Sequence, residues 1–215
     1  MDQIFNKLYY TTSFFSRRFY QDVIQMNNIK LKIDTERVEK NSKYLYPTYY
    51  FSNIHYFFKE PTRIIDNVFI GNGTHSENLD LLKKNNFKHI FNCAINIPNY
   101  YPTDFNYVKL PLQDDKTELK LINLIPLFIE NMNQIKNEMN TDDSIFIHCE
   151  FGKSRSIAFM IIYIMYYHEK SFDEAYKIAK FKRPVIDMNL NFKKDILEYF
   201  QKNPTHKNKI YKVSI

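Results

Sequence analysis

Glycine and cysteine are scarce in this chain, and no apolar run reaches membrane-spanning length. Three of the 215 residues are glycine, two are cysteine and none is tryptophan. Two cysteines, Cys93 and Cys149, do not form the disulfide framework typical of a small secreted protein. The longest apolar helical run, residues 157–167, is about half of what a bilayer requires. The sequence opens without a signal-peptide pattern, so we expect a cytoplasmic protein, with a nuclear location as the alternative.

Several functional classes lack their marker residues. None of the six histidines has metal-ligand spacing to cysteines or carboxylates, so no metal site is predicted. Gly71 and Gly73 lack the continuation of a dinucleotide-binding motif, and no cofactor is predicted. The net charge of +6 would attract acidic partners. Because lysines occur throughout and no nucleic-acid-binding motif is present, we expect no dedicated nucleic-acid binding.

The scarcity of glycine draws attention to HCEFGKSRS at residues 148–156, where Cys149 and Arg155 flank Gly152. With this composition, the pattern HCxxGxxR arises by chance in on the order of one in 10⁵ such chains. A core cysteine near an unrelated surface arginine is therefore the weaker interpretation. The preceding residues 144–147 predict a buried strand and the following residues 157–167 a buried helix. A loop from a strand end to a helix start can direct its N–H groups at phosphate.

The residue types in this segment suit phosphoryl transfer through a covalent intermediate. A thiol attacks as its thiolate, which a helix N-terminus and a nearby guanidinium both favour, and the segment offers both to Cys149. Arg155 provides a planar fork for two phosphoryl oxygens. At Gly152 we expect a Cβ to obstruct either the loop backbone or the anion. Ser156 could donate a hydrogen bond to the sulfur when the phosphoenzyme is hydrolysed.

At these residues the chain resembles the cysteine-dependent protein phosphatases, and most of all their dual-specificity branch. RIIDNVFIG, residues 63–71, is similar to the opening strand of that domain. Residues 87–115 are similar to its strand, loop, strand and acid loop, and residues 171–192 to its closing helices. The resemblance covers about residues 60–203. Phe151 and Met188 depart from the family pattern, which more often has a small or polar residue and a proline there.

The resemblance implies the remaining site residues. Residues 110–114, LPLQD, match the family's run ending in the catalytic aspartate, so Asp114 joins Cys149, Arg155 and Ser156 as a predicted catalytic residue. Asp115 is the competing candidate, and these carboxylates could instead cap a helix. His148 is expected to hydrogen-bond the loop backbone and support the thiolate, with general-base duty the less favoured role. The predicted substrate-binding residues are Glu150, Phe151, Gly152, Lys153, Ser154 and Arg155.

Strands alternating with helices predict an α/β fold of three layers, a mainly parallel central sheet flanked by helices. We also expect an amino-terminal helical extension. Strands are expected at residues 63–71, 87–94 and 144–147, and helices at 79–84, 119–140, 157–167, 172–180 and 191–201. Residues 71–73 predict a turn after a strand.

Three segments are predicted: an aromatic-rich extension at residues 1–59, a catalytic domain at 60–203 and a basic tail at 204–215. Apolar side chains recur every three or four residues from Phe5 to Met26, which predicts an amphipathic helix over about residues 2–26. Its apolar face could pack on the catalytic domain, pair with a second copy or bind a membrane surface or partner. A homodimer through residues 2–26 is therefore one prediction.

These features together predict a phosphoprotein phosphatase that hydrolyses phosphotyrosine and phosphoserine/threonine esters through a cysteinyl-phosphate. Two alternatives stay open. A phosphoinositide or phospholipid phosphatase could use Lys153 to meet a second phosphate, although Glu150 opposes polyphosphorylated head groups. A non-catalytic phosphate-binding module would keep the fold without turnover, although the presence of Cys149, Arg155 and Asp114 argues against it.

Overall fold

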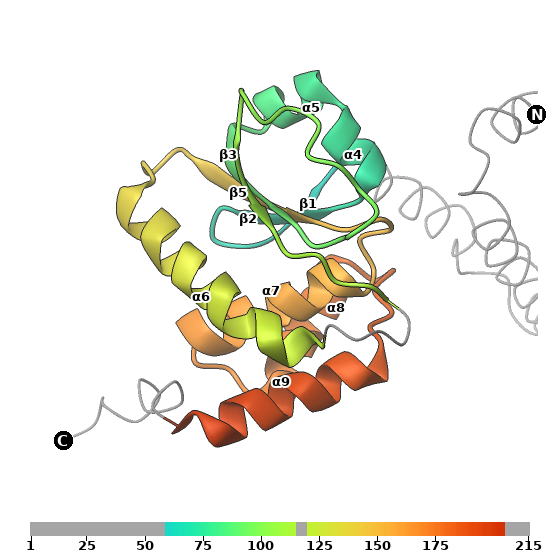
Figure 1. Ribbon diagram of the computed structural model, residues 1–215, viewed down its shortest axis with the longest axis vertical. Helices are drawn as coiled ribbons and strands as arrows, with labels where there is room; N and C mark the ends of the chain where they lie inside the picture. The colour runs from blue at the N-terminus through green and yellow to red at the C-terminus, as the bar shows by residue number, and fades with distance from the viewer. Residues whose placement is uncertain (1–58, 115–119, 205–215) are drawn as a thin grey trace, which may run out of the picture. The chain divides into compact units, whose positions relative to one another are not determined.

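The computed structural model describes residues 59–114 and 120–204, which contain a five-stranded sheet (Figure 1). Its strands, in spatial order, are β1 (Thr62–Ile65), β2 (Val68–Gly71), β5 (Ser144–His148), β3 (Phe87–Asn92) and β4 (Asn106–Lys109). Strands β2, β5, β3 and β4 run parallel, and β1 pairs antiparallel with β2. The helices are α4 (Gly73–Glu77), α5 (Leu79–Lys84), α6 (Leu121–Glu138), α7 (Arg155–Tyr167), α8 (Phe172–Lys182) and α9 (Leu190–Lys202).

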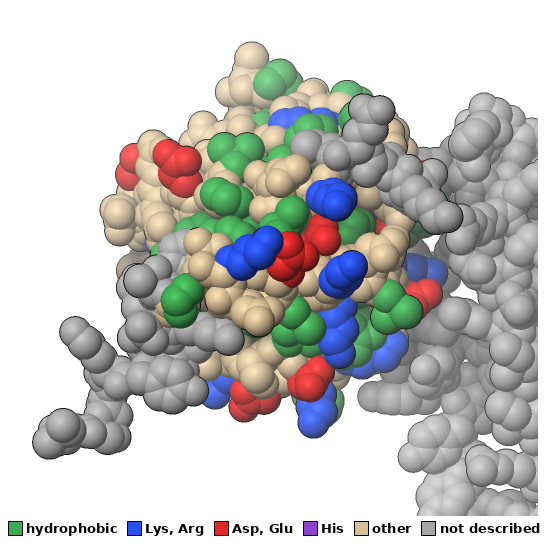
Figure 2. Space-filling view, turned by 60° about the horizontal axis from the view of Figure 1, so that its bottom comes forward, with side chains coloured by type: hydrophobic (Ala, Val, Ile, Leu, Met, Phe, Trp, Pro, Cys, Tyr) green, Lys and Arg blue, Asp and Glu red, His purple; other side chains and the backbone are tan. Residues whose placement is uncertain are grey.

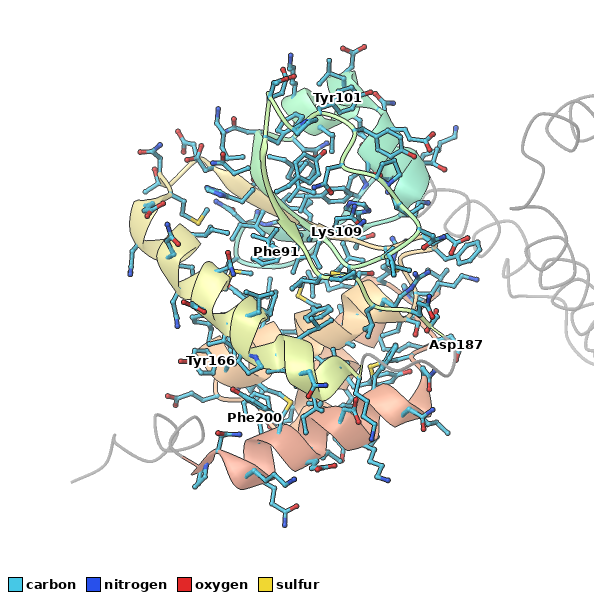
Figure 3. The ribbon with its side chains drawn as sticks, viewed as in Figure 1. Phe91, Tyr101, Lys109, Tyr166, Asp187 and Phe200 are labelled. Atoms are coloured by element: carbon cyan, nitrogen blue, oxygen red, sulfur yellow. The ribbon has the colours of Figure 1, made fainter. Side chains whose placement is uncertain are left out.

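Helices cover both faces of the sheet. Figure 1 shows α6 to α9 together on one side and α4 and α5 on the other. The larger apolar core lies between the sheet and the α6 to α9 layer, and it includes Phe91, Tyr166 and Phe200 (Figure 3). A smaller core on the opposite face joins Leu82 of α5 to Phe146 of β5. The predicted three-layer α/β fold with a mainly parallel sheet is confirmed.

Two local predictions near the start of the domain are wrong. Residues 63–71 form the hairpin β1–β2 instead of one strand, and Asp66 takes a φ of +48° in its turn, a conformation that Asp tolerates better than most residues. Residues 71–73 lead directly into α4 instead of a free turn. Asn72 accepts a hydrogen bond from the His75 backbone at 2.9 Å, and the His75 ring accepts one from the Asn72 backbone at 3.2 Å. This reciprocal cap starts the helix.

The strand and helix that flank the signature segment follow from their apolar patterns. Every residue of β5 is buried, and α7 is buried from its first residue through Tyr166. In the parallel register His148, the last residue of β5, pairs with Gly71 of β2 and Asn92 of β3. Ligands bind at the carboxyl ends of strands in such sheets. The fold therefore places residues 149–154 at that edge, between two neighbouring strand ends.

The surface is mixed in charge on the face shown in Figure 2, where Lys and Arg side chains are interleaved with Asp and Glu. Helix α9 contributes the ion pairs Lys202–Glu198 at 2.7 Å and Lys193–Asp173 at 3.6 Å. None of the helices in the described ranges is both long enough and apolar enough to span a membrane. The predicted helix over residues 2–26, with the homodimer assigned to it, lies outside the described residues.

Candidate active site

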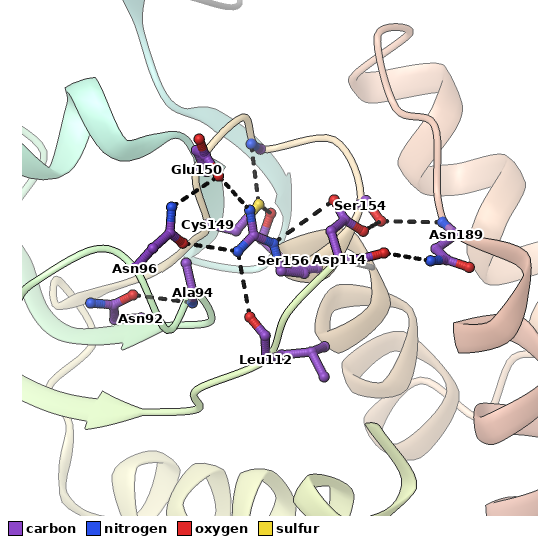
Figure 4. A network of polar contacts seen from close by, with 12 residues as sticks. Asn92, Ala94, Asn96, Leu112, Asp114, Cys149, Glu150, Ser154, Ser156 and Asn189 are labelled. Atoms are coloured by element: carbon purple, nitrogen blue, oxygen red, sulfur yellow. Dashed lines mark hydrogen bonds and ion pairs between the residues drawn. The ribbon is translucent and has the colours of Figure 1, made fainter. Parts of the chain in front are cut away.

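The loop between β5 and α7 holds Cys149 at its base (Figure 4). Cys149 is 1% exposed, and its sulfur has two hydrogen-bonding neighbours. The Gly152 N–H donates to Sγ at 3.2 Å, and the Ser156 Oγ lies 3.3 Å from it. Both contacts stabilise negative charge on sulfur, since each can direct a hydrogen at it. This is the arrangement that a thiolate nucleophile and leaving group requires.

Gly152 is needed for the close approach of two backbone segments. Its φ is +65°, and a Cβ at this position would lie 2.5 Å from the Gly71 carbonyl oxygen and 2.9 Å from the Arg183 Nη2 atom. Of the two obstructions expected from the sequence, the backbone one is observed. The Cβ would strike the backbone at Gly71, where β2 ends.

Contacts from distant segments fix the loop from behind. Arg183, at the C-terminal end of α8, is fully buried and donates from Nε to the Gly152 carbonyl and from Nη1 to the Thr62 hydroxyl, each at 2.8 Å. Burial lowers its pKa to about 10, while Cys149 acts in the opposite direction. The Gly73 N–H also donates to the carbonyl of Glu150 at 3.0 Å. Buried polar contacts within the chain therefore hold the loop in place, and these contacts do not involve substrate.

Arg155 keeps two N–H donors available. A guanidinium has five N–H donors. Nη1 donates to Asn96 Oδ1 at 3.2 Å and to the Leu112 carbonyl at 3.4 Å, and Nη2 donates to Glu150 Oε2 at 3.0 Å (Figure 4). Nε has no hydrogen-bond acceptor within the described part of the chain. One Nη2 hydrogen and the Nε hydrogen remain, which matches two phosphoryl oxygens.

The charge of Arg155 is secured by its surroundings. Burial by itself would lower the pKa of Arg155, but the nearby Cys149, Asp114 and Glu150 together raise it. Asp114 Oδ2 lies 3.8 Å from Nε, and Glu150 contributes the closer ion pair at 3.0 Å. The guanidinium thus stays a cation in a buried site where an arriving phosphate group would be desolvated.

Asp114 approaches Arg155 at Nε, whereas Glu150 contacts Nη2. Its Oδ1 accepts a hydrogen bond from the Ser154 hydroxyl at 2.5 Å, and its carbonyl accepts one from the Asn189 amide at 2.6 Å. Its side chain is 41% exposed, so a leaving group at the surface can reach it. Its rival Asp115 lies outside the described residues.

His148 is fully buried at the end of β5. Its ring stacks on Phe146 at 5.2 Å, and within residues 59–114 and 120–204 neither ring nitrogen has a hydrogen-bond partner of good geometry. Burial lowers the pKa of His148 to about 3, although the neighbouring Cys149 backbone opposes this. The ring does interact with the Cys149 backbone, the loop contact expected from the sequence, although the geometry falls short of a well-formed hydrogen bond. A ring that stays neutral and stacked fills space beneath the nucleophile.

The other predicted substrate-binding residues lie around the loop mouth. Glu150, Phe151 and Lys153 are half-buried, and Ser154 is buried with its hydroxyl directed to Asp114. The Lys153 carbonyl accepts from the Asp187 N–H at 3.0 Å, which ties the loop to the segment before α9. In the described ranges no three His, Cys, Asp or Glu side chains are arranged to hold a metal ion.

Three residues with contacts in the site were not identified from the sequence. The Arg-Pro pair at Arg183 signals the end of a helix, but no pattern shows that this arginine is buried against the loop. Asparagine is a favoured N-cap residue, and Asn189 Oδ1 caps α9 by accepting from the Asn191 N–H at 2.9 Å. Its second contact, to Asp114, is tertiary. Asn96 carries no sequence signal.

Comparison with known proteins agrees with this geometry. Residues 68–202 match the family described as the dual specificity phosphatase catalytic domain. The chain is 30% identical over 168 residues to the Arabidopsis thaliana protein-tyrosine-phosphatase MKP1, covering 75% of this chain and 21% of that protein. It is 32% identical over 138 residues to human dual specificity protein phosphatase 14, and the match covers 64% of this chain and 67% of that protein. It spans about a third or less of several other relatives, including 14% of the Drosophila melanogaster phosphatase Slingshot.

Solved structures share the fold. A mouse putative dual specificity phosphatase complexed with zinc tungstate superposes with a TM-score of 0.61 at 22% identity, covering 81% of this chain and 99% of that chain. The human tyrosine phosphatase-like serine/threonine/tyrosine-interacting protein superposes with a TM-score of 0.60 at 24% identity, covering 67% of this chain and 98% of that chain. Because the family match spans well over half of the sequence and includes the whole signature loop, the chain belongs to the dual-specificity phosphatase family.

Proposed function

We propose that this protein is a phosphoprotein phosphatase that hydrolyses phosphotyrosine and phosphoserine/threonine esters through a cysteinyl-phosphate. The observation that carries this proposal is the placement of three groups around one point. The Gly152 N–H and the Ser156 hydroxyl contact the Cys149 sulfur, Arg155 keeps Nε without an acceptor in the described residues, and Asp114 Oδ2 lies 3.8 Å from that Nε. Nucleophile, anion clamp and proton donor are the parts that phosphomonoester hydrolysis needs.

In the first step the Cys149 thiolate attacks phosphorus in line with the leaving oxygen. The S–P bond forms as the P–O bond breaks, and protonated Asp114 gives its proton to the departing oxygen. Arg155 and the loop N–H groups hold the equatorial oxygens, whose charge is redistributed in the transition state.

In the second step water attacks the phosphocysteine. Asp114, now a carboxylate, accepts a proton from that water, and the P–S bond breaks to release inorganic phosphate. The Ser156 hydroxyl, 3.3 Å from Sγ, donates to the sulfur as it leaves as a thiolate. The cycle therefore returns both Cys149 and Asp114 to their starting protonation states.

Two observations favour a phosphoprotein over the alternatives. The Glu150 carboxylate lies 3.0 Å from Arg155 and is half-buried, so a second phosphate group entering beside the first would meet a negative charge. This disfavours a phosphoinositide or phospholipid head group. The proposed nucleophile, anion clamp and proton donor are all present in the chain, which disfavours a non-catalytic binding module, although the shared fold alone would not separate the two.

A substrate panel tests this function. The full chain is expected to hydrolyse p-nitrophenyl phosphate and phosphopeptides, and to act on soluble phosphoinositides at least about tenfold more slowly in kcat/KM. Cys149→Ser, prepared in parallel, controls for contaminating phosphatases. A preference for phosphoinositides would assign the lipid alternative, and phosphate binding without turnover would assign the binding module.

Location and assembly complete the proposal. We place the protein in the cytoplasm or nucleus because the nucleophile must stay a free thiol, and both cysteines are free. We also propose a homodimer through residues 2–26, one of the three roles that their apolar spacing leaves open. A shortened protein that begins at Tyr44 should sediment as a monomer and keep its rate on p-nitrophenyl phosphate. A dimer that persists in this protein, or failure of the protein to fold, would exclude this assignment.

A further inference from the structure

The loop after β3 is fixed by a buried asparagine. Asn92 ends β3 and is fully buried. Its Oδ1 accepts from the Ala94 N–H at 3.2 Å, and its Nδ2 donates to the Ile97 carbonyl at 2.8 Å and to Asn99 Oδ1 at 2.9 Å. These three bonds tie both ends of residues 94–99 to one rigid side chain. The loop backbone is therefore set by the sheet and not by substrate.

A second anchor comes from the adjacent strand. Lys109 ends β4 (Figure 3), and its Nζ donates to the Ala94 carbonyl at 2.6 Å and also to the Ile97 carbonyl. The Ile95 N–H in turn donates to the Leu112 carbonyl at 3.4 Å, the oxygen that also accepts from Arg155. Residues 94–99 thus link the strand ends to the segment that leads to Asp114.

This braced loop presents Asn96 to the catalytic arginine. Asn96 Oδ1 accepts from Arg155 Nη1 at 3.2 Å, and Asn96 Nδ2 donates to Glu150 Oε2 at 3.1 Å. The same Glu150 oxygen accepts from Arg155 Nη2 at 3.0 Å. The three side chains close a ring of hydrogen bonds at the Nη1 and Nη2 end of the guanidinium.

We propose that Asn96 is a positioning residue, which acts on Arg155 both directly and through Glu150 to aim the Arg155 fork at the phosphoryl group. The ring occupies Nη1 and one hydrogen of Nη2. The Nε hydrogen and the second Nη2 hydrogen remain as the pair of donors that faces substrate. Without Asn96, Nη1 loses an acceptor and Glu150 loses the donor that holds its carboxylate in place. The guanidinium could then rotate toward Glu150, which would weaken its contacts with the transition state.

This inference rests on the proposed phosphatase function and predicts a split between kinetic constants. Asn96→Ala should lower kcat for p-nitrophenyl phosphate by about tenfold, the effect of roughly one charge-assisted hydrogen bond. KM should change by less than about threefold, since the loop N–H groups still bind the phosphate group in the ground state. Asn131→Ala is the matched control, because Asn131 donates to the Leu127 carbonyl on its own helix, and it should match the wild type.

A double-mutant cycle separates positioning from general destabilisation. Arg155→Lys has no fork to aim, so adding Asn96→Ala to it should cause no further loss. A second test exchanges the hydrogen-bond donor and acceptor between residues 96 and 150. Asn96→Asp places two carboxylates together and should lower kcat. Adding Glu150→Gln should recover at least about threefold of that loss, since the introduced glutamine amide can donate where the Asn96 amide did.

Three outcomes would overturn the positioning role. The kcat of Asn96→Ala could lie within twofold of the wild-type kcat, or Asn96→Ala could lower kcat further in the Arg155→Lys background. The third is that Glu150→Gln recovers none of the kcat lost in Asn96→Asp. Each of these presupposes an active wild type. A wild-type chain with no Cys149-dependent turnover would instead refute the proposed function itself, and the positioning role with it.

Discussion

The signature loop, residues 149–154, and the acid segment, residues 110–114, meet at Arg155 but are held by different means. The nucleophile of the loop is buried, and the loop is fixed mainly through backbone groups, with Gly152 packed against Gly71 and the Gly152 carbonyl bound by Arg183. The acid segment ends at a side chain that is 41% exposed and is held through two side chains, Ser154 and Asn189.

This difference follows from what each group must do. The nucleophile must meet phosphorus along one line, so a rigid buried cradle favours it. The acid must meet leaving groups of different sizes, so it lies at the rim, where water and substrate can reach it. We therefore expect all-or-none effects at the nucleophile and graded, substrate-dependent effects at the acid.

The sharpest test of this contrast is at the nucleophile. Cys149→Ser should lower kcat by about four orders of magnitude or more, because a serine hydroxyl is not ionised at neutral pH. The fold and the anion cradle should persist, since Ser fills the same space. Turnover of p-nitrophenyl phosphate measures the loss of kcat. Calorimetric titration with tungstate tests the anion cradle, and the melting temperature tests the fold. Activity near wild type would rule out a cysteinyl-phosphate.

The acid should give a smaller and substrate-dependent loss. Asp114→Ala should lower kcat by about 10² to 10³ for phenyl phosphate, whose leaving oxygen is basic, and by less than about tenfold for an activated aryl ester that leaves without a proton. Asp115→Ala is the matched control and should retain most activity on both esters. If Asp115→Ala shows the leaving-group dependence instead, the acid is the neighbouring residue.

Beneath the nucleophile, His148 should make the fold sensitive to acid. Its pKa is about 3 in the fold and about 6.5 in an unfolded chain. Between these values the unfolded state binds a proton that the folded state does not. Stability therefore falls as pH drops, by about 1.4 kcal/mol per pH unit.

Replacing His148 should remove this part of the acid sensitivity. Between pH 7 and pH 4 the wild type should lose about 3 kcal/mol more of its unfolding free energy than His148→Asn. Urea unfolding at pH 7, 5.5 and 4 measures both proteins. Equal losses in the two would show that this ring is protonated in the folded state.

The smallest effect is expected at Cys93, which lies next to the site without facing substrate. It is fully buried, and burial raises the pKa of its thiol, with Cys149 adding to this. Cys93→Ser should lower stability by about 1 to 2 kcal/mol and leave kcat within about twofold. A Cys93–Cys149 disulfide found by mass spectrometry after mild peroxide would contradict a purely structural role.

Parts of the fold follow directly from local sequence. The apolar runs at residues 144–147 and 157–167 are continuous, and a strand or helix buried on all sides needs no partner to be recognised. The helices predicted at residues 79–84, 172–180 and 191–201 occur within one or two residues of those bounds. The hairpin within residues 63–71 was missed because its reversal depends on one left-handed residue, Asp66, whose conformation no periodicity encodes.

The sequence by itself determined the chemistry of the site, because Cys149, Gly152, Arg155 and Ser156 lie within eight residues and one strand-loop-helix unit brings them together. Only the tertiary structure decided how that chemistry is aimed. Asn96 reaches Arg155 across 59 residues, and Asn189 reaches Asp114 across 75. Such contacts form where the carboxyl ends of parallel strands converge, and a single chain carries no local pattern that records which side chains will meet there.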